Sequence, residues 1–499
     1  MKKYIYYFLI TVVVTSSLLS CKKDYLETNP TDSVSQADIF KTTTNAWTAI
    51  NGIHRLLYVQ YNGQQDQGGQ SKNMIDMDFL GEDLVSPTTA NGWFISTYRW
   101  QSHRNANSVS TPYFNYQFYY YIIANANMII ANIDGAEGPD ADKKAIKGQA
   151  YAYRAWGYFQ MIQLYGKRYD ENTPNDGLGL PLVIEPTTEK LPRSTVAEVY
   201  AQIVKDVNDA ITNLTGATAR TNASHINVNV AKGLKARIAL AMQDWATAAQ
   251  FANEARQGFS LMSSAQYMQG FNDYTNPEWM WGSHQIADQS TFFFSFFAFM
   301  SCNFNSSNIR TGPKCINSTL YNAISATDIR KQLWDPTGAN MAFPVPQNGA
   351  TSGARFPYMH RKFLAAGGNL SSIGDVPLMR VAEMYLIEAE AKARAGQDAA
   401  AASVLYTLAK QRDPNYVLSV NTGQALIDEI MIQRRVELWG EGFRFYDLKR
   451  LNLPLDRTGA NHVTAVAVTL TVPAGDKAWE FLIPQTELNT NSNCVQNPL

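Results

Sequence analysis

The segment that decides the fold is "LKARIALAMQDWATAAQFANEAR" (residues 234–256), because a near copy, "EAEAKARAGQDAAAASVLYTLAKQR" (residues 388–412), follows later in the chain. Aligned on their shared Gln-Asp, both copies predict a small-residue helix, a tight turn, an aspartate N-cap (Asp244 and Asp398) and a second small-residue helix. Four alanines coincide: Ala239, Ala241, Ala246 and Ala248 against Ala393, Ala395, Ala400 and Ala402. Small side chains let antiparallel helices approach closely. The pair therefore predicts tetratricopeptide-like helical hairpins that stack into a curved scaffold, rather than two unrelated alanine-rich helices.

Helical spacing of apolar residues extends beyond the hairpins and makes the predicted fold mainly α. It covers residues 37–59 and 113–133, and a third helix ends at Gly166. Ser194 is predicted to cap a fourth helix. Few short strands are expected, among them the alternating stretch "HVTAVAVTLTV" at residues 462–472.

Residues 258–375 differ in composition from the helical parts. They are rich in Asn, Ser, Gly, Pro and aromatic residues, which predicts long loops and short strands mounted on the helices. Binding residues often collect on loops that a rigid scaffold supports. We therefore expect one domain over residues 36–499, with an N-terminal helical part (36–257), a loop-rich insertion (258–375) and a C-terminal part (376–499).

The N-terminus predicts a lipoprotein signal peptide over residues 1–20. Lys2 and Lys3 precede an apolar stretch, residues 4–19, that is too short for an ordinary membrane span. That stretch ends in Leu-Leu-Ser-Cys, which is typical of a bacterial lipobox and predicts acylation of Cys21; the alternative is an ordinary signal peptide with an incidental cysteine. The polar residues 21–35 would then form the tether of a lipid-anchored protein.

Composition favours neutral polar ligands outside the cytoplasm. The 42 Lys and Arg residues nearly balance the 43 Asp and Glu residues, so no basic field exists to attract nucleic acid. Only 17% of residues are charged, while aromatic residues reach 12%, more than a core requires. Some aromatic side chains are therefore expected on a binding surface.

The remaining cysteines and the search for chemical motifs indicate no metal or cofactor. Cys302 and Cys315 could form a disulfide in an oxidising compartment, although free thiols fit the sequence equally well, and Cys494 has no partner in either case. No nucleophile elbow, zinc-binding HExxH motif or phosphate-binding loop is present in the sequence. The six histidines are scattered, with no pair at helical ligand spacing.

The segment "RRVELWGEGFRFYDLKRL" (residues 434–451) raises the question of catalysis, because Glu437 and Glu441 could be a glycosidase carboxylate pair. Each acid lies three residues from an arginine, Arg434 or Arg444. Carboxylates beside arginines are stabilised in the charged form, whereas a general acid needs the opposite shift. We therefore predict a structural ion-pair clamp between two short helices, formed by Arg434, Arg435, Glu437, Glu441 and Arg444.

Two aromatic segments are better candidates for ligand binding. Sugars present apolar faces on which Trp and Tyr stack, and hydroxyl rims that Asn and Arg can bond. "NGWFISTYRW" (residues 91–100) has this composition, and "YTNPEWMW" (residues 274–281) offers a second set. The alternative is that each Trp is part of the core; of Trp279 and Trp281, one is expected to be buried. The candidate ligand-binding residues are Asn91, Trp93, Tyr98, Arg99, Trp100, Tyr274 and Trp279.

Several motifs resemble the SusD/RagB family of Bacteroidetes outer-membrane lipoproteins. They are "CKKDYLETNP" after the lipobox, "KGQAYAYRAWGYFQMIQLYG", "GLGLPLV", "RSTVAEVYAQIVKDVNDA", "VPLMRVAEMYLIEAEAKARAG", "RRVELWGEGFRFYDLKRLN" and "FLIPQTELNTNSNCVQNP". They occur in family order over essentially the whole chain, and residues 376–499 carry the family signature.

The resemblance implies an α-helical fold, display on the cell surface, and a SusC-like TonB-dependent β-barrel transporter as partner. It implies capture of oligo- or polysaccharide for that transporter, without catalysis. Some relatives bind calcium, but the sequence offers no dense carboxylate loop and we predict none. Three alternatives stay open: a peptide-binding member of the family, a lipid-anchored glycoside hydrolase, and a protein–protein scaffold.

Overall fold

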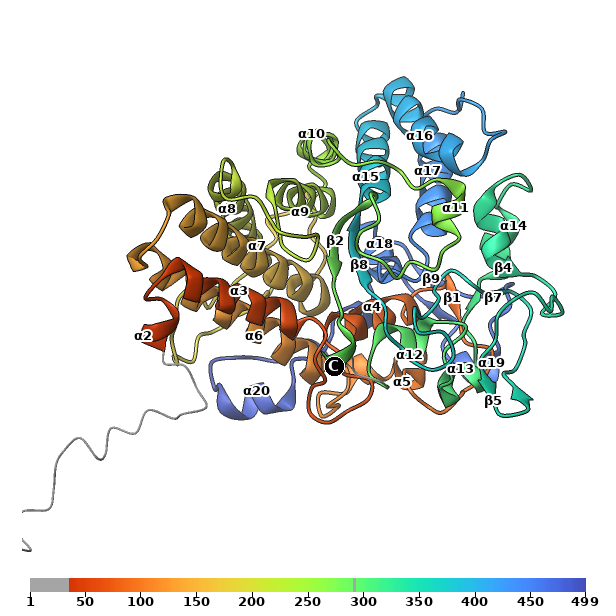
Figure 1. The fold of residues 1–499 in the computed structure, drawn as a ribbon, viewed down its shortest axis with the longest axis horizontal. Helices are drawn as coiled ribbons and strands as arrows, with labels where there is room; N and C mark the ends of the chain where they lie inside the picture. Colours follow the sequence, from red (N-terminus) through yellow and green to blue (C-terminus); the bar gives the residue numbers. More distant parts are fainter. Residues whose placement is uncertain (1–35, 290–292) are drawn as a thin grey trace, which may run out of the picture.

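The computed structural model describes residues 36–289 and 293–499. The helices of its first half are mostly arranged in a stack (Figure 1). They are α2 (Gln36–Ile39), α3 (Thr43–Leu56), α4 (Gln70–Phe79), α5 (Ile95–Tyr98), α6 (Pro112–Asn132), α7 (Asp140–Tyr165), α8 (Val196–Leu214), α9 (Val228–Ala241) and α10 (Trp245–Ala255). The long helices α6 and α7 confirm the predicted periodicity, and the α7 helix ends at Gly166 as predicted. The single helical stretch predicted over residues 37–59 is divided into α2 and α3.

The predicted hairpin is present twice, as α9–α10 and as α15 (Val381–Arg394) with α16 (Asp398–Arg412). The two copies pack side by side through α10 and α15. Asp244 caps α10 by accepting a bond from Thr247 N at 3.1 Å. The cap predicted at Asp398 is wrong, since Gln397 is the N-cap residue of α16. The turn residue with positive φ is Gln243 in the first copy and Gly396 in the second. In the alignment Gly396 comes one position earlier than Gln243, and α16 likewise begins one position earlier than α10.

The cap of α8 is shifted by one residue from the predicted Ser194. Thr195 accepts from Glu198 N at 3.2 Å, and the Glu198 carboxylate accepts from Thr195 N at 2.8 Å, which makes a capping box. Ser194 is still paired with the preceding loop, because its N–H donates to Leu180 O at 2.9 Å.

Short elements make up the loop-rich part of the chain. Its helices are α11 (Ser264–Tyr267), α12 (Phe296–Met300), α13 (Ser307–Thr311) and α14 (Ser318–Asn322), so short helices accompany the predicted loops and strands. An antiparallel sheet runs in the order β1 (Leu84–Val85), β3 (Cys315–Ile316), β7 (Met359–His360) and β4 (Trp334–Asp335). A separate hairpin joins β5 (Gln347–Asn348) to β6 (Thr351–Ser352).

Strand β2 (Trp279–Ser283) pairs with β8 (Val376–Arg380) and ties the loop-rich part to the second hairpin. We predicted that one of Trp279 and Trp281 would be buried, but both are, with exposures of 2% and 0%. The register of β2 shifts at Trp281, and all five residues of the strand are buried. The simple alternation of an exposed strand therefore does not apply.

The C-terminal part contains α17 (Gly423–Glu437), α18 (Arg444–Arg450), β9 (Leu455–Asp456), α19 (Thr464–Ala467), β10 (Thr471–Val472) and α20 (Gln485–Thr490). Helices α17 and α18 confirm the two short helices predicted around residues 434–451. The alternating stretch 462–472 forms a helical turn, α19, before the strand β10, because Val468 takes a left-handed conformation with φ of 60°.

Within residues 36–289 and 293–499, no helix combines the length and the apolar character that a membrane span requires. The predicted signal peptide, the acylated Cys21 and the tether lie outside the described residues.

Candidate functional site

Two segments that the sequence singled out separately lie against each other. Asn91 Nδ2 donates to Ser307 Oγ at 3.0 Å, and Asn308 Nδ2 donates to Asn91 Oδ1 at 2.8 Å. Thr88 Oγ1 donates to Thr311 O at 2.8 Å. The loop before α5 is thereby fixed onto α13. We call residues 88–93 together with α13 the Asn91 surface.

The backbone of this loop is held in an unusual conformation. Ala90, Gly92 and Phe94 all have positive φ, at 44°, 92° and 65°. Each non-glycine residue in this region costs on the order of 1–3 kcal/mol, and such strain is concentrated at functional sites. Phe94 anchors the loop, since its ring lies 5.0 Å from that of Phe299 between centroids. Gly312 allows the close approach, because a Cβ there would meet Ala90 Cβ at 2.8 Å.

Four of the seven candidate ligand residues reach the surface. Asn91 is exposed, and Trp93, Arg99 and Tyr274 are partly exposed. Asn91 and Trp93 belong to the Asn91 surface, and their side chains carry an amide and an indole. Arg99 Nε donates to Val466 O at 3.0 Å, and the Tyr274 ring lies 4.1 Å from that of His284. Arg99 and Tyr274 are thus engaged with other parts of the chain.

The other three candidates lie in the core, which corrects the expectation that they face a ligand. Trp100 is 6% exposed, donates from Nε1 to Leu80 O at 3.1 Å, and packs edge-on against Trp479. Tyr98 is fully buried and bonds His462 Nδ1 at 2.6 Å. Trp279 is covered within β2. The composition of residues 91–100 could not reveal this, because the turn of α5 places Tyr98 in the core and Trp100 follows it there, while Arg99 between them stays partly exposed.

A hollow of about 400 Å³ was not predicted as a site. Tyr321, Trp334, Asn340, Phe343 and Arg361 are among the residues that line it. They come from α14, from the edge of the four-stranded sheet and from the loops around it. The aromatic and amide content of residues 258–375 was the only signal in the sequence, and it did not indicate which residues meet.

The predicted clamp forms ion pairs, but with partners from distant segments. Glu437 is bonded by Arg380 at 2.9 Å, Arg412 at 3.1 Å and Arg330 at 3.1 Å. Glu441 is bonded by Arg380 at 2.6 Å and Lys362 at 2.7 Å. Glu278 joins the same cluster by bonding Arg412 at 2.8 Å. The cluster connects the residue before β2 with β8, α16 and α17, so it fastens far more of the molecule than two adjacent helices.

The arginines of the clamp pair elsewhere as well. Arg434 bonds Asp447 at 2.8 Å, Arg435 bonds Asp83 at 3.0 Å, and Arg444 bonds Glu82 at 2.9 Å. The local pairs predicted from sequence distance, Arg434 with Glu437 and Arg444 with Glu441, are therefore wrong in their partners. Spacing of three residues identified the ion-pairing residues but not their three-dimensional neighbours.

The carboxylates of Glu437 and Glu441 are held in the charged form. Burial by itself would raise the pKa of Glu437, but Arg412, Arg380 and Arg330 hold that pKa well below its ordinary value. Burial likewise opposes ionisation of Glu441, while Arg380 and Lys362 lower its pKa on balance. A general acid needs a raised pKa, so neither group suits that role.

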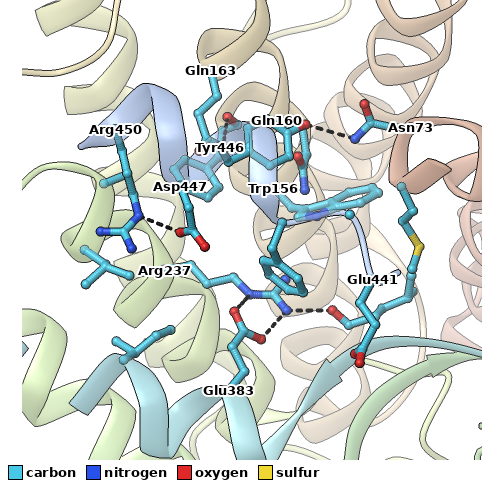
Figure 2. A pocket seen from close by; sticks show the side chains of 18 of the residues that line it. Asn73, Trp156, Gln160, Gln163, Arg237, Glu383, Glu441, Tyr446, Asp447 and Arg450 are labelled. Carbon is cyan, nitrogen blue, oxygen red and sulfur yellow. Dashed lines mark hydrogen bonds and ion pairs between the residues drawn. The ribbon is translucent and has the colours of Figure 1, made fainter. Parts of the chain in front are cut away.

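A small polar cavity lies beside the clamp (Figure 2). Asn73 donates to Tyr446 Oη at 3.0 Å, and Asp447 accepts from Arg450 Nε at 2.8 Å. In its wall the Arg237 guanidinium donates from Nε to the Glu383 carboxylate at 2.6 Å. Its volume is about 70 Å³, well below the roughly 300–1,000 Å³ of typical ligand pockets. We therefore regard it as part of the packed interior.

Cys302 and Cys315 are free, buried thiols, so the disulfide left open by the sequence does not form in this structure. Burial raises the pKa of both thiols to about 12, which keeps them protonated. Across the described ranges, no group of three or more His, Cys, Asp or Glu side chains is placed to hold a metal ion.

The chain combines two helical hairpins with a loop-rich part that presents an exposed amide and a partly exposed indole. A family model described as starch-binding and associating with the outer membrane matches residues 24–240, and the model of the SusD family matches residues 243–499. The second match alone spans more than half of the chain. The chain therefore belongs to the SusD family, a family of carbohydrate-binding proteins, and the predicted family and mainly α fold are confirmed.

Individual relatives agree with this assignment. A SusD-like protein of Formosa agariphila is 23% identical over 90% of this chain and 92% of its own length. The crystal structure of a SusD-like carbohydrate-binding protein from Bacteroides vulgatus superposes with a TM-score of 0.79, at 25% identity, over 91% of this chain and 98% of that one. A laminarin-binding SusD-like protein shares the fold, with a TM-score of 0.69 and 19% identity over 92% of this chain and all of that one.

Proposed function

We propose that this protein binds oligo- or polysaccharide at the Asn91 surface and delivers it to a SusC-like TonB-dependent transporter in the outer membrane. Acylation of Cys21 would hold it on the cell surface, where the tether gives the domain access to both glycan and transporter. Membership of the SusD family supports carbohydrate binding and the transporter partner, and the lipobox supports the anchor.

The strained loop is the observation that carries the site. Two non-glycine residues with positive φ, Ala90 and Phe94, flank Asn91 and Trp93. Such strain is concentrated at functional sites, where it can hold a side chain in one orientation. Bonds to Ser307 and Asn308 fix the Asn91 amide, so little conformational entropy is lost when a ligand binds.

The chemistry of this surface suits a neutral sugar. The indole of Trp93 can stack on the apolar face of a pyranose ring, while Ser307 and Arg310 can bond ring hydroxyls. An aromatic contact of this kind contributes about 0.5–1.5 kcal/mol beyond the area that it buries. The strained backbone fixes the direction of the Trp93 indole, which gives specificity to the contact.

We propose binding without catalysis. Family members and similar structures are described as binding proteins. The charged, buried state of Glu437 and Glu441 also argues against the glycoside hydrolase alternative. A peptide ligand fits the family equally well in principle; the exposed amide and hydroxyl groups and the laminarin-binding relative favour a glycan.

Affinity electrophoresis of the purified protein on a panel of polysaccharides, including laminarin and starch, tests the proposal. For any glycan that retards the unmodified protein, the affinity of the Trp93→Ala variant should be at least about ten-fold lower, which corresponds to about 1.4 kcal/mol of binding free energy. The matched control is Trp245→Ala, another partly exposed tryptophan, at the start of α10, which should bind like the unmodified protein.

Three results would contradict the proposal. If Arg361→Gln abolishes binding and Trp93→Ala does not, the glycan site is the 400 Å³ hollow rather than the Asn91 surface. If only peptides are bound, the ligand class is wrong. Release of reducing sugar that a single acid substitution abolishes would favour the hydrolase.

A further inference from the structure

A second hollow, of about 310 Å³, lies where the end of α3, residues 222–225 and the end of β2 meet. Figure 1 shows α3, in red, running toward β2, in green. Its volume falls within the range of small-molecule pockets, roughly 300–1,000 Å³. It shares no lining residue with the Asn91 surface. The exposed Asn51 and Ile286 stand at its margin, so the hollow opens to solvent.

Two histidines form part of its wall. The rings of His54 and His225 stand edge to face, with centroids 4.4 Å apart and planes at 67°. His54 is only 8% exposed, and its Nδ1 is bonded to the hydroxyl of Tyr153 in the core. Burial raises the pKa of Tyr153 well above its ordinary value, so the phenol stays protonated and donates to Nδ1. The proton of the neutral imidazole is then on Nε2, on the side of the ring away from Tyr153.

Three buried polar atoms of this wall lack a hydrogen-bond partner within the residues that the structure describes. They are His54 Nε2, His225 Nδ1 and Ser283 Oγ. Buried polar groups are nearly always bonded, and a buried donor without an acceptor destabilises the fold. Their concentration around one hollow indicates a place for a polar ligand, whose acceptor atoms would satisfy His54 Nε2 and Ser283 Oγ.

The charge around the hollow favours an anion. Among the described residues that line it, none is a carboxylate, whereas Arg55 contributes a guanidinium group. Arg220 lies next to His225 and donates from Nη1 to His225 O at 3.1 Å. The neighbouring acid, Asp375, is occupied by His284 Nδ1 at 2.9 Å and by Gln285 N at 2.9 Å. The wall therefore offers donors and positive charge.

We propose that this hollow binds the carboxylate group of a small organic acid, such as a sugar acid. His54 Nε2 and Ser283 Oγ donate to the carboxylate, and Arg55 pairs with its charge. This site is distinct from the proposed glycan surface and does not depend on it.

Binding at this site should be linked to proton uptake. Burial first, and then His225, holds the pKa of His54 well below its ordinary value, while burial and Arg220 lower that of His225. A bound carboxylate favours the charged imidazolium, so it raises both pKa values, and affinity increases as the pH falls. The other titratable or charged groups around the pair are Tyr153 on α7, His284 with Asp375 beyond β2, Arg220, and Arg55 and Tyr58 at the end of α3.

Calorimetric titration of the purified full chain with D-glucuronate, acetate and D-glucose tests this inference. We expect both acids to bind, glucose not to bind, and affinity for the acids to be at least three-fold higher at pH 6 than at pH 8. Equal binding of glucose and glucuronate overturns the inference, as does failure of both acids to bind at either pH.

Variants identify the site. Arg55→Gln should weaken glucuronate binding about ten-fold and Ser283→Ala about three-fold. The matched control Arg168→Gln, at a partly exposed arginine paired with Asp170, should have no effect.

His54→Phe should remove the dependence of the affinity on pH. If that variant does not fold, the outcome rests on Arg55→Gln and Ser283→Ala. Unchanged affinity in both of these variants contradicts the assignment, and glycan binding by Arg55→Gln shows that the Asn91 surface is independent of it.

Discussion

Arg380 contacts three carboxylates at once, Glu278, Glu437 and Glu441, and is 1% exposed. Taking such charges out of water is costly, and the geometry of the cluster offsets that cost only while all of its members are present. Single residues of this kind hold β2, β8 and α17 in one arrangement. They are structural, and their influence on ligand binding is indirect.

Arg444 provides a test at this scale. Arg444→Ala leaves Glu82 and Asp83 with less compensating charge in a buried position, so the free energy of unfolding should fall by about 3–5 kcal/mol. Chemical denaturation measures this loss. Lys205→Ala, which breaks the exposed pair with Asp209, is the control and should cost under about 0.5 kcal/mol. The glycan affinity of the folded Arg444→Ala protein should be unchanged, and a loss of affinity would argue against a purely structural role.

Asp447 predicts a defined dependence of stability on pH. Burial opposes its ionisation, but Arg434 and Arg450 lower its pKa from 3.8 to about 2. Because the folded pKa is the lower one, the stabilisation is complete above about pH 4 and is lost as the pH falls toward about 2; it amounts to about 2 kcal/mol. The destabilisation caused by Asp447→Asn should therefore be about 2 kcal/mol smaller at pH 2 than at pH 6. A difference that does not vary with pH would contradict this expectation.

At the scale of elements, the hairpins depend on small residues where helices meet. Ala248 of α10 is fully buried, whereas Ala246, two residues earlier, is exposed. The alignment of the two hairpins marks both positions as conserved alanines between the copies, but only one lies in a helix interface.

The pair Ala248→Leu and Ala246→Leu separates packing from helix propensity. Leucine at position 248 overfills the contact of α10 with its neighbours and should lower the free energy of unfolding by about 1–3 kcal/mol. At position 246 the same change is solvent-exposed and should alter stability by less than about 0.5 kcal/mol. Equal effects in thermal denaturation would show that α10 is not closely packed.

At the scale of the whole molecule, the main apolar core extends from Ala46 to Cys494, and a second apolar cluster packs α15, α16 and α17 together. The two family matches meet between residues 240 and 243, at the turn inside the first hairpin. Ion pairs such as Arg435 with Asp83 join the two matched regions directly.

We therefore expect residues 36–499 to unfold as one unit, as the predicted single domain requires. Near-ultraviolet circular dichroism and tryptophan fluorescence should give coincident thermal transitions. Two separate transitions would show that the regions before and after residue 242 fold independently.

The anchor is also a property of the whole molecule. Cys21→Ser removes the thiol that would be acylated, so the protein should lose incorporation of labelled palmitate and leave the membrane fraction. Unchanged membrane association of this variant would contradict the proposed lipid anchor.

The sequence by itself determined the helical hairpins, the long helices and the family. These follow from local periodicity, small-residue spacing and ordered motifs, which neighbouring residues specify. It also identified Asn91 and Trp93 as candidates and recognised that Glu437 and Glu441 are ion-paired.

Only the tertiary structure decided which residues meet. Arg330, one partner of Glu437, lies more than a hundred residues away from it along the chain. The burial of Trp100 likewise depends on Trp479. The placement of Asn91 against α13 and the pairing of His54 with His225 are equally long-range. Ion pairing and burial depend on distance in space, and sequence separation does not fix that distance once the chain has folded back on itself.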